Sequence, residues 1–329
     1  MAYNQYASVA EETTWGSPVT RTKFMKVYEG SYLEHMSDTD TSAAMGGNAG
    51  ADPEFVYVKG QRGEGKISLP VSYDDQGILV MLKHAFGLYA FTAGSPAVHT
   101  FTRKAGPPFG AGSVATAAGL SVELNYELGD TNLAARLREG GLVNSLALGW
   151  SAGEEIKADF ELIGEQVTQI AKTGYPTFPT YDTYMQNFTQ AAVSVNSTDD
   201  TAVMTGFDFK MSNGYEPVIT LGSYNTKQPR RKGKSDISGT IKMLWDGASS
   251  QAAVLWGRYK ANTTTAIVAT ITGPTNYSWT FTLNSVKLTS ATLTQAEGQL
   301  QECEFGYKVI NDSSNTACKL VVNNTGVTI

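Results

Sequence analysis

The sequence predicts an all-β protein, mainly strand with one short flanking helix in each of two tandem β-sandwich or open-barrel domains. Long stretches alternate between apolar and polar residues, and Gly, Asn, Asp and Ser separate them. Such alternation is typical of antiparallel strands that bury one face. The 329 residues, 41% hydrophobic and only 17% charged, suffice for two domains.

The clearest predicted strand is Leu120–Leu128, in which apolar and polar residues alternate throughout. Thr, Val, Tyr and Phe, which favour strands, are frequent in this and similar stretches. The other predicted strands are Gly65–Val71, Val143–Leu148, Ile156–Leu162, Ile267–Ile271, Trp279–Leu288 and Leu300–Val309.

Two segments, Asp75–Phe86 and Ser250–Lys260, instead carry apolar residues at helical spacing. Gly87 follows the first segment and is a candidate C-cap. Asp74 and Asp75 lie where carboxylates cap a helix and complement its dipole. We therefore expect one short amphipathic helix in each half.

The same order of features occurs twice along the chain, which indicates a duplication. Gly65–Leu69 matches Gly239–Met243, and an aromatic residue, an acid and a helix follow each. Farther on, Leu142–Leu148 matches Thr282–Leu288, and the extra length of the first copy falls in Thr92–Ala118. Chance similarity of two β-rich segments is the alternative.

The duplication predicts a first domain over residues 1–175, with an N-terminal arm and a long loop over 30–64. The second domain covers 176–329. A Pro- and Tyr-rich stretch over 173–181 would join the two domains.

Composition argues against several functions. The net charge of −6 disfavours a nucleic-acid coat, which needs cations to neutralise phosphates. Two cysteines and three scattered histidines provide neither a zinc site nor many general bases, and no P-loop is present. The Met45–Gly50 cluster is not set between a strand and a helix, so it is interpreted as a flexible loop. We expect no enzyme activity, no cofactor and no metal.

The N-terminus lacks the basic start and apolar core of a signal peptide, and no apolar run is long enough for a membrane span. Synthesis in the cytoplasm without export is the expectation.

Two charged stretches precede the two matching glycine strands. The acidic one holds Glu34, Asp38, Asp40, Asp52 and Glu54, and the basic one holds Lys227, Arg230, Arg231, Lys232 and Lys234. The basic stretch is open to three interpretations: a solvated loop, a nucleic-acid site, or a contact with an acidic surface on another subunit. The last makes both stretches candidate contacts between subunits or rings.

Five features occur in order along the chain. Glu11–Val19 has the pattern Glu-x-Thr-x-aromatic-Gly-Ser/Thr-Pro. Phe207–Pro217 reads as a strand that ends in an Asn-Gly-x-Glu-Pro turn, and Lys232–Ile241 as a basic loop before Ser-Gly-Thr. The helix that follows comes fourth, and the closing pair Leu283–Leu288 and Cys303–Tyr307 comes last. Together these features, which cover most of the chain, resemble the tail tube proteins of long-tailed bacteriophages. The first copy lacks the Asn-Gly-x-Glu-Pro turn.

The resemblance implies two tail-tube-like domains in a structural virion protein. In this family, rings of six domains stack into a hollow tube, and DNA passes through its inner β-barrel without sequence-specific binding. Two domains in each chain then imply rings of three chains with pseudo-six-fold symmetry. The location would be the virion tail, after assembly in the host cytoplasm.

By the same resemblance, the partners are other copies of the chain and tape-measure, tail-terminator and distal tail proteins, with no membrane. Candidate lumen residues are Glu154, Glu155, Asp159 and Glu161. From the residues alone, Glu154 and Glu155 follow the turn Trp150–Gly153 and are interpreted as a solvated hairpin. Neighbours on a strand face opposite sides, so the two are not expected to act as an acid/base pair. The alternative function is a two-domain β-sandwich module that binds carbohydrate or a cell surface, which would remain monomeric.

Overall fold

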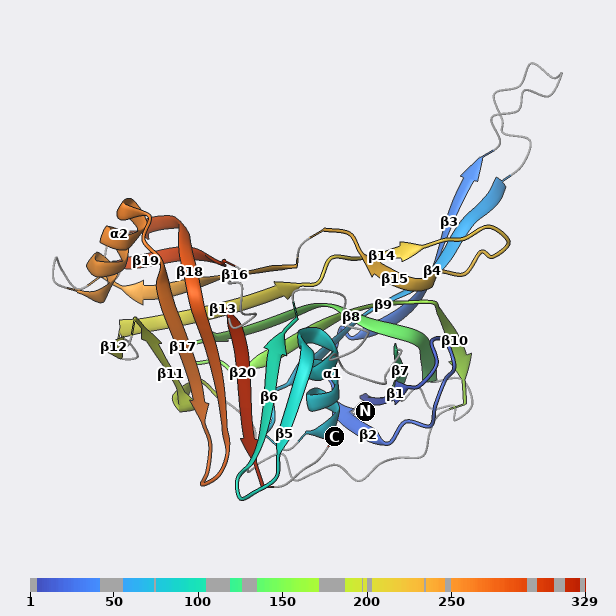
Figure 1. Ribbon diagram of the computed structural model, residues 1–329, viewed down its shortest axis with the longest axis horizontal. Helices are drawn as coiled ribbons and strands as arrows, with labels where there is room; N and C mark the ends of the chain where they lie inside the picture. The colour runs from blue at the N-terminus through green and yellow to red at the C-terminus, as the bar shows by residue number, and fades with distance from the viewer. Residues whose placement is uncertain are drawn as a thin grey trace, which may run out of the picture.

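The computed structural model describes residues 5–41, 56–73, 75–104, 119–125, 135–171, 187–196, 198–199, 203–233, 235–245, 250–294, 301–310, 317–325 and 329. Strands dominate, with two short α-helices, and this confirms the all-β class (Figure 1).

The first half contains one helix, α1 (Gln76–Phe86), among strands. Its strands are β1 (Tyr6–Glu12), β2 (Lys23–Lys26), β3 (Tyr32–Thr41), β4 (Val56–Pro70), β5 (Gly87–Thr92), β6 (Ala97–Arg103), β7 (Gly119–Asn125), β8 (Ala135–Ser151), β9 (Lys157–Gly164) and β10 (Gln166–Ile170).

The second half contains a 3₁₀ turn, η2 (Phe188–Gln190), and the helix α2 (Gln251–Ala261). Its strands are β11 (Ala191–Val195), β12 (Thr198–Asp199), β13 (Met204–Ser212), β14 (Tyr215–Val218), β15 (Lys227–Arg231), β16 (Asp236–Leu244), β17 (Thr265–Thr272), β18 (Ser278–Thr294), β19 (Glu302–Val309) and β20 (Cys318–Asn324).

Both predicted helices are confirmed, and each is capped at both ends. Asp75 Oδ1 accepts hydrogen bonds from the backbone N–H groups of Gly77 and Ile78, at 2.8 and 3.2 Å. The Ser250 hydroxyl oxygen accepts a hydrogen bond from the backbone N–H of Ala253 at 3.3 Å. Gly87 and Asn262 end the helices in the left-handed conformation. Helix α1 is almost wholly buried, whereas α2 buries only two of its residues.

Seven strand pairings of the first half have a counterpart in the second, in the same order. They are β1–β2, β1–β7, β3–β4, β4–β9, β7–β8, β8–β9 and β8–β10, against β11–β12, β11–β17, β13–β16, β16–β19, β17–β18, β18–β19 and β18–β20.

The two glycines matched in the sequence occupy the same position in these pairings. A Cβ added to Gly65 would lie 2.6 Å from the Tyr32 carbonyl oxygen, and one added to Gly239 would lie 1.8 Å from that of Asp208. Both glycines therefore permit a close approach to the neighbouring strand.

The structure corrects three details of the sequence interpretation. The described residues within 30–64 are mainly strand rather than loop, because β3 and β4 pair and project as an arm beyond the body (Figure 1), while residues 42–55 of the predicted loop lie outside the described residues. The described part of the inserted segment is the β5–β6 hairpin, which begins at Gly87 rather than at Thr92, and residues 105–118 of the prediction lie outside the described residues. The basic stretch is not a loop throughout, since Lys227–Arg231 is a strand paired with β14.

One hydrophobic core runs through both halves. It includes Leu69 and Phe160 from the first half and Phe209 and Ile241 from the second, all at most 1% exposed. Among the described strands, two pairings join the halves, β8 with β13 and β6 with β20, and isolated bridges join Gln61 to Asn225 and Glu155 to Asn187.

Candidate assembly surface

Eight strands form one continuous antiparallel run across the two halves. Their order by hydrogen-bonded neighbours is β3-β4-β9-β8-β13-β16-β19-β18. The central contact in this run is between β8 and β13, from Ser145 opposite Ser212 to Ser151 opposite Gly206. We call this contact the internal joint.

Apolar side chains fill one face of the internal joint. Leu148 lies opposite Phe209, and the two residues are 2% and 1% exposed. The Trp150 ring stacks on Phe207 with their centroids 4.7 Å apart. The Asn213 amide donates to the carbonyls of Ala85, in α1, and Val143, in β8, at 2.9 and 3.1 Å. Burial and hydrogen bonds thus fix the register between the halves.

The two ends of the eight-stranded run are edge strands, β3 and the last part of β18. Among the described strands, β3 pairs only with β4, and β18 beyond Lys287 pairs only with β19. Tyr32 and Leu293, at these edges, are 41% and 40% exposed. Edge strands with exposed apolar side chains are templates for pairing with another chain.

The exposed face of the run is polar and carries both charges. Asp159 and Glu161 alternate outward along β9 with buried residues. Asp159 accepts from the Ser68 hydroxyl and pairs with Lys66 at 2.8 Å, and Glu161 accepts from the Ser145 hydroxyl at 2.5 Å. Further outward ion pairs join Lys242 to Glu304 at 3.6 Å and Lys308 to Asp236 at 2.7 Å.

Glu154 and Glu155 lie in the turn between β8 and β9 rather than on that face. Glu154 is exposed, whereas Glu155 is half-buried and accepts a hydrogen bond from the Tyr28 hydroxyl. The four lumen candidates therefore divide between the sheet face and its rim.

The acidic candidates of the β3–β4 arm have partners within the arm. Asp38 pairs with Arg62, which also contacts Glu64 at 2.5 Å, and Asp40 pairs with Lys59. Glu34 is exposed on the polar face of β3. Asp52, Glu54 and the Met45–Gly50 cluster lie outside the described residues.

The basic candidates lie on strand β15 of the β14–β15 hairpin and just beyond it. Lys227 and Arg230 are exposed, and Lys232 pairs with Glu216 at 2.9 Å. The Arg231 guanidinium lies over the Tyr215 ring, 5.6 Å from its centroid. Lys234 lies outside the described residues. Within the described ranges, no ion pair joins the acidic and basic candidates of one chain.

The hairpin nevertheless contacts the arm through its backbone. The Gln61 N–H donates to the Tyr224 carbonyl at 2.7 Å, and the Thr226 N–H donates to the Gln61 carbonyl at 3.0 Å. Figure 1 shows β14 and β15 beside the base of the β3–β4 arm. The loop of the second half thus lies along the arm of the first.

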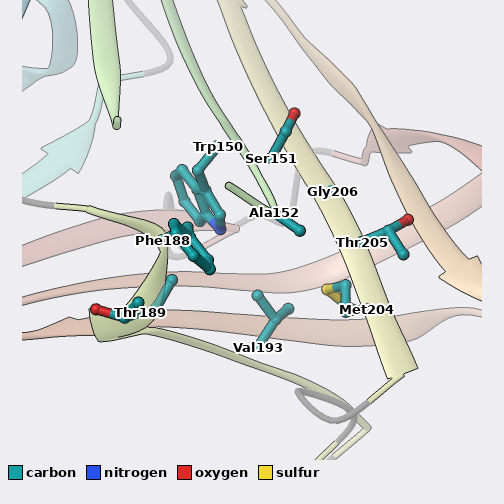
Figure 2. Close-up of a pocket in the computed structure, with 10 residues that line it drawn as sticks. Trp150, Ser151, Ala152, Phe188, Thr189, Val193, Met204, Thr205 and Gly206 are labelled. Atoms are coloured by element: carbon teal, nitrogen blue, oxygen red, sulfur yellow. The ribbon is translucent and has the colours of Figure 1, made fainter. Parts of the chain in front are cut away.

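A pocket of about 300 Å³ opens where the internal joint ends (Figure 2). Trp150, Phe188, Val193 and Met204 supply its apolar lining. No lining residue has a titratable side chain, so the pocket offers no general acid or base.

No cluster of potential metal ligands occurs among the described residues. Within the same ranges, no helix is long and apolar enough to cross a membrane.

The described strands thus form a β-rich protein with a continuous sheet whose exposed face is polar. Residues 3–308 match the family of phage tail tube proteins, so the chain belongs to that family and is a structural component of the phage tail. Membership confirms the resemblance seen in the sequence and implies self-association into a tube. No curated protein matches the chain.

The sequence predicted the charged stretches but not the two edge strands of the run. Leu293 lies beyond the predicted strand Trp279–Leu288, and Tyr32 falls in the predicted loop. The alternation of Thr292, Leu293 and Thr294 was the available signal.

Proposed function

We propose that three copies of this chain close into a ring, that rings stack into the hollow tail tube, and that DNA passes through the lumen into the host. The observation that carries this proposal is the eight-stranded run, which already joins two similar units edge to edge and has an edge strand at each end.

The repeated pairings support two tube units in each chain, approximately 1–175 and 176–329. Three chains then supply six units, which favours a three-fold ring with pseudo-six-fold symmetry. Eight strands from each of three chains would give a barrel of 24 strands. Barrels of about 16–18 strands already enclose aqueous channels, so a wider barrel leaves room for DNA.

The polar face of the run is the face that we assign to the lumen, because the opposite face forms the core. Asp159 and Glu161 would contribute to it, with Glu154 and Glu155 at its rim. Carboxylates repel phosphates, and their ion pairs with lysines moderate the field. Such a lining favours sliding over sequence-specific binding.

The charged candidates would meet between chains. Counting along the paired strands, the position in the second half equivalent to Gln61 is Ser235, beside the basic hairpin. Within one chain, the β14–β15 loop of the second half contacts Gln61 of the first half. The β3–β4 arm is the equivalent of that loop, so the arm of a neighbouring chain would contact Ser235 in the same way and would reach the basic residues beside it. Tape-measure, terminator and distal tail proteins would meet the end rings, after assembly in the host cytoplasm.

Negative-stain microscopy and native mass spectrometry of the purified protein test the proposal. Tubes, and rings of three times the 35.3 kDa chain mass, are expected. Rings of six chains would contradict the three-fold arrangement, and persistent monomers would favour a binding module instead.

A charge reversal tests the contact between arm and hairpin. Arg230→Glu should weaken tube formation, as should high salt, because exposed ion pairs are screened. Lys260→Glu, an equal charge change at another exposed residue, is the control. Normal, salt-insensitive tubes of the Arg230 variant would refute this contact.

A further inference from the structure

We propose that β18 and β3 of neighbouring chains pair antiparallel in one register, with Thr292 of one chain opposite Glu34 of the next. This inference rests on the proposed ring assembly and specifies the contact that closes the ring. The partner is a second copy of this chain, because the internal joint, between β8 and β13, already shows the equivalent contact within one molecule.

Two pairs of β-bulges fix how the halves correspond. In β8, an extra residue falls between Arg138 and Gly141 opposite β7, and another is Asn144 opposite β9. In β18, extra residues fall between Leu283 and Val286 opposite β17, and at Thr289 opposite β19. Each pair of matching bulges gives the same offset of 145 residues between β8 and β18: Gly141 corresponds to Val286, and Asn144 to Thr289.

The same registers carry the correspondence across the other strands. Val143 lies opposite Leu162, which lies opposite Gly65, which lies opposite Leu33. In the second half, the equivalent path runs through Leu288, Tyr307, Gly239 and Phe209. Leu33 therefore corresponds to Phe209, and Gly65 to Gly239, as the sequence match had indicated independently.

The register between chains follows from the internal joint when each residue is replaced by its equivalent in the other half. Within one chain, Ala147 lies opposite Lys210 and Leu148 opposite Phe209. The equivalents are Thr292 opposite Glu34 and Leu293 opposite Leu33 of the neighbour. The full set runs from Ser290 opposite Met36 to Thr294 opposite Tyr32.

Burial at the two joints supports the same conclusion. Leu148 is 2% exposed where β13 covers it, whereas its equivalent, Leu293, is 40% exposed in the edge strand β18. A slip of one residue would turn Leu293 toward the polar face, so burial of its side chain selects the register.

Disulfide cross-linking in assembled tubes tests the register. Directly opposed residues in antiparallel strands have Cα atoms about 4.5–5.5 Å apart, within the range that a disulfide spans. Thr292→Cys and Glu34→Cys, combined in one chain, place both thiols on the polar face. Native Cys303 and Cys318 should not compete, because burial raises the pKa of their thiols to about 11 and about 12.

The internal joint provides a matched control, since Ala147→Cys with Lys210→Cys should form a disulfide within one chain regardless of assembly. Pairing Thr292→Cys with Tyr32→Cys or Met36→Cys tests registers displaced by two residues, which place the Cα atoms too far apart.

With oxidised glutathione as oxidant, the expected result for the Thr292–Glu34 pair is loss of the 35.3 kDa band in a non-reducing denaturing gel. Covalent multiples of the chain should replace it, and the displaced pairs should remain single chains. Tubes whose displaced pair cross-links instead, or in which no pair does so, would overturn the register while leaving the proposed function intact. Absence of tubes and rings from the unmodified protein would instead overturn the proposed function.

Discussion

Leu293 and Leu148 allow a matched pair of truncations that separates folding from assembly. Leu148 is 2% exposed opposite Phe209 in the internal joint, whereas Leu293 is 40% exposed in the edge strand β18. Leu148→Ala should lower the free energy of unfolding of the separated chain by about 2–5 kcal/mol, as buried leucine truncations do. Leu293→Ala should change it by only about 0.5 kcal/mol, as exposed substitutions usually do.

The effect of Leu293→Ala on assembly follows from its exposed fraction. If β3 of a neighbour covers Leu293, ring closure buries the remaining 40% of this residue. Full burial of a leucine contributes about 1.5–3 kcal/mol, so each contact loses about 0.6–1.2 kcal/mol and a ring of three loses about 1.8–3.6 kcal/mol. At about 1.4 kcal/mol for each factor of ten, the ring association constant falls about 20- to 400-fold.

Two measurements check this pair. Denaturant unfolding, followed by circular dichroism below the assembly concentration, gives the stability of each separated chain. Sedimentation at increasing protein concentration gives the concentration at which rings or tubes form. The reasoning is refuted if Leu293→Ala leaves that concentration unchanged, or if it destabilises the separated chain as much as Leu148→Ala does.

Two further changes test the chain itself. Gly239→Ala should destabilise it by about 1–3 kcal/mol or more in denaturant unfolding, because the added Cβ would lie 1.8 Å from the Asp208 carbonyl oxygen; unchanged stability would refute the close approach. Burial acts to raise the pKa of Glu11, but hydrogen bonds and charges from His84 and Lys83 outweigh it and lower the pKa to about 2. The resulting stabilisation is complete above the ordinary value of 4.5 and is lost as pH falls toward 2, so Glu11→Gln should flatten the pH dependence of unfolding in this window; an unchanged slope would contradict the role of Glu11.

The helices could be predicted from the sequence because their determinants are local. Apolar spacing, the Asp75 N-cap and the Gly87 C-cap all lie within one segment, and the structure has each of them. Alternation predicted the strands for the same reason. The Gly65–Gly239 match also corresponds in the structure, because close approach to a neighbouring strand demands glycine at both positions.

The match between Leu142–Leu148 and Thr282–Leu288 was wrong by five residues. Each closing strand has two bulges, and the match placed the second bulge of β8, at Asn144, on the first bulge of β18, at Asn284 and Ser285. Similar alternation surrounds both bulges, so the sequence pattern cannot distinguish them. The hydrogen-bonded partners on β7 and β9 do, because they lie on other strands.

The internal joint was also beyond local reasoning. Its two strands, β8 and β13, are separated by the stretch over 152–203, and nothing in either segment specifies the other as a partner. The β5–β6 hairpin has no counterpart between α2 and β17, so the repeat offered no template for it. Pairings of this kind depend on the whole fold rather than on neighbouring residues.

The β5–β6 hairpin makes the contact within a chain stronger than the contact proposed between chains. Within a chain, the halves share both β8–β13 and β6–β20 pairing and a common core. At the contact between chains, β10 of the neighbouring chain would occupy the place that β20 has at the internal joint. The second half that it faces has no equivalent of the β5–β6 hairpin, so β10 would have no strand to pair with there. The contact between chains therefore has one sheet pairing where the internal contact has two.

On heating, tubes should dissociate into folded chains before the chains unfold, so light scattering should fall at a lower temperature than the β-sheet circular dichroism. Coincident transitions over a range of protein concentrations would show that the two contacts are equally strong.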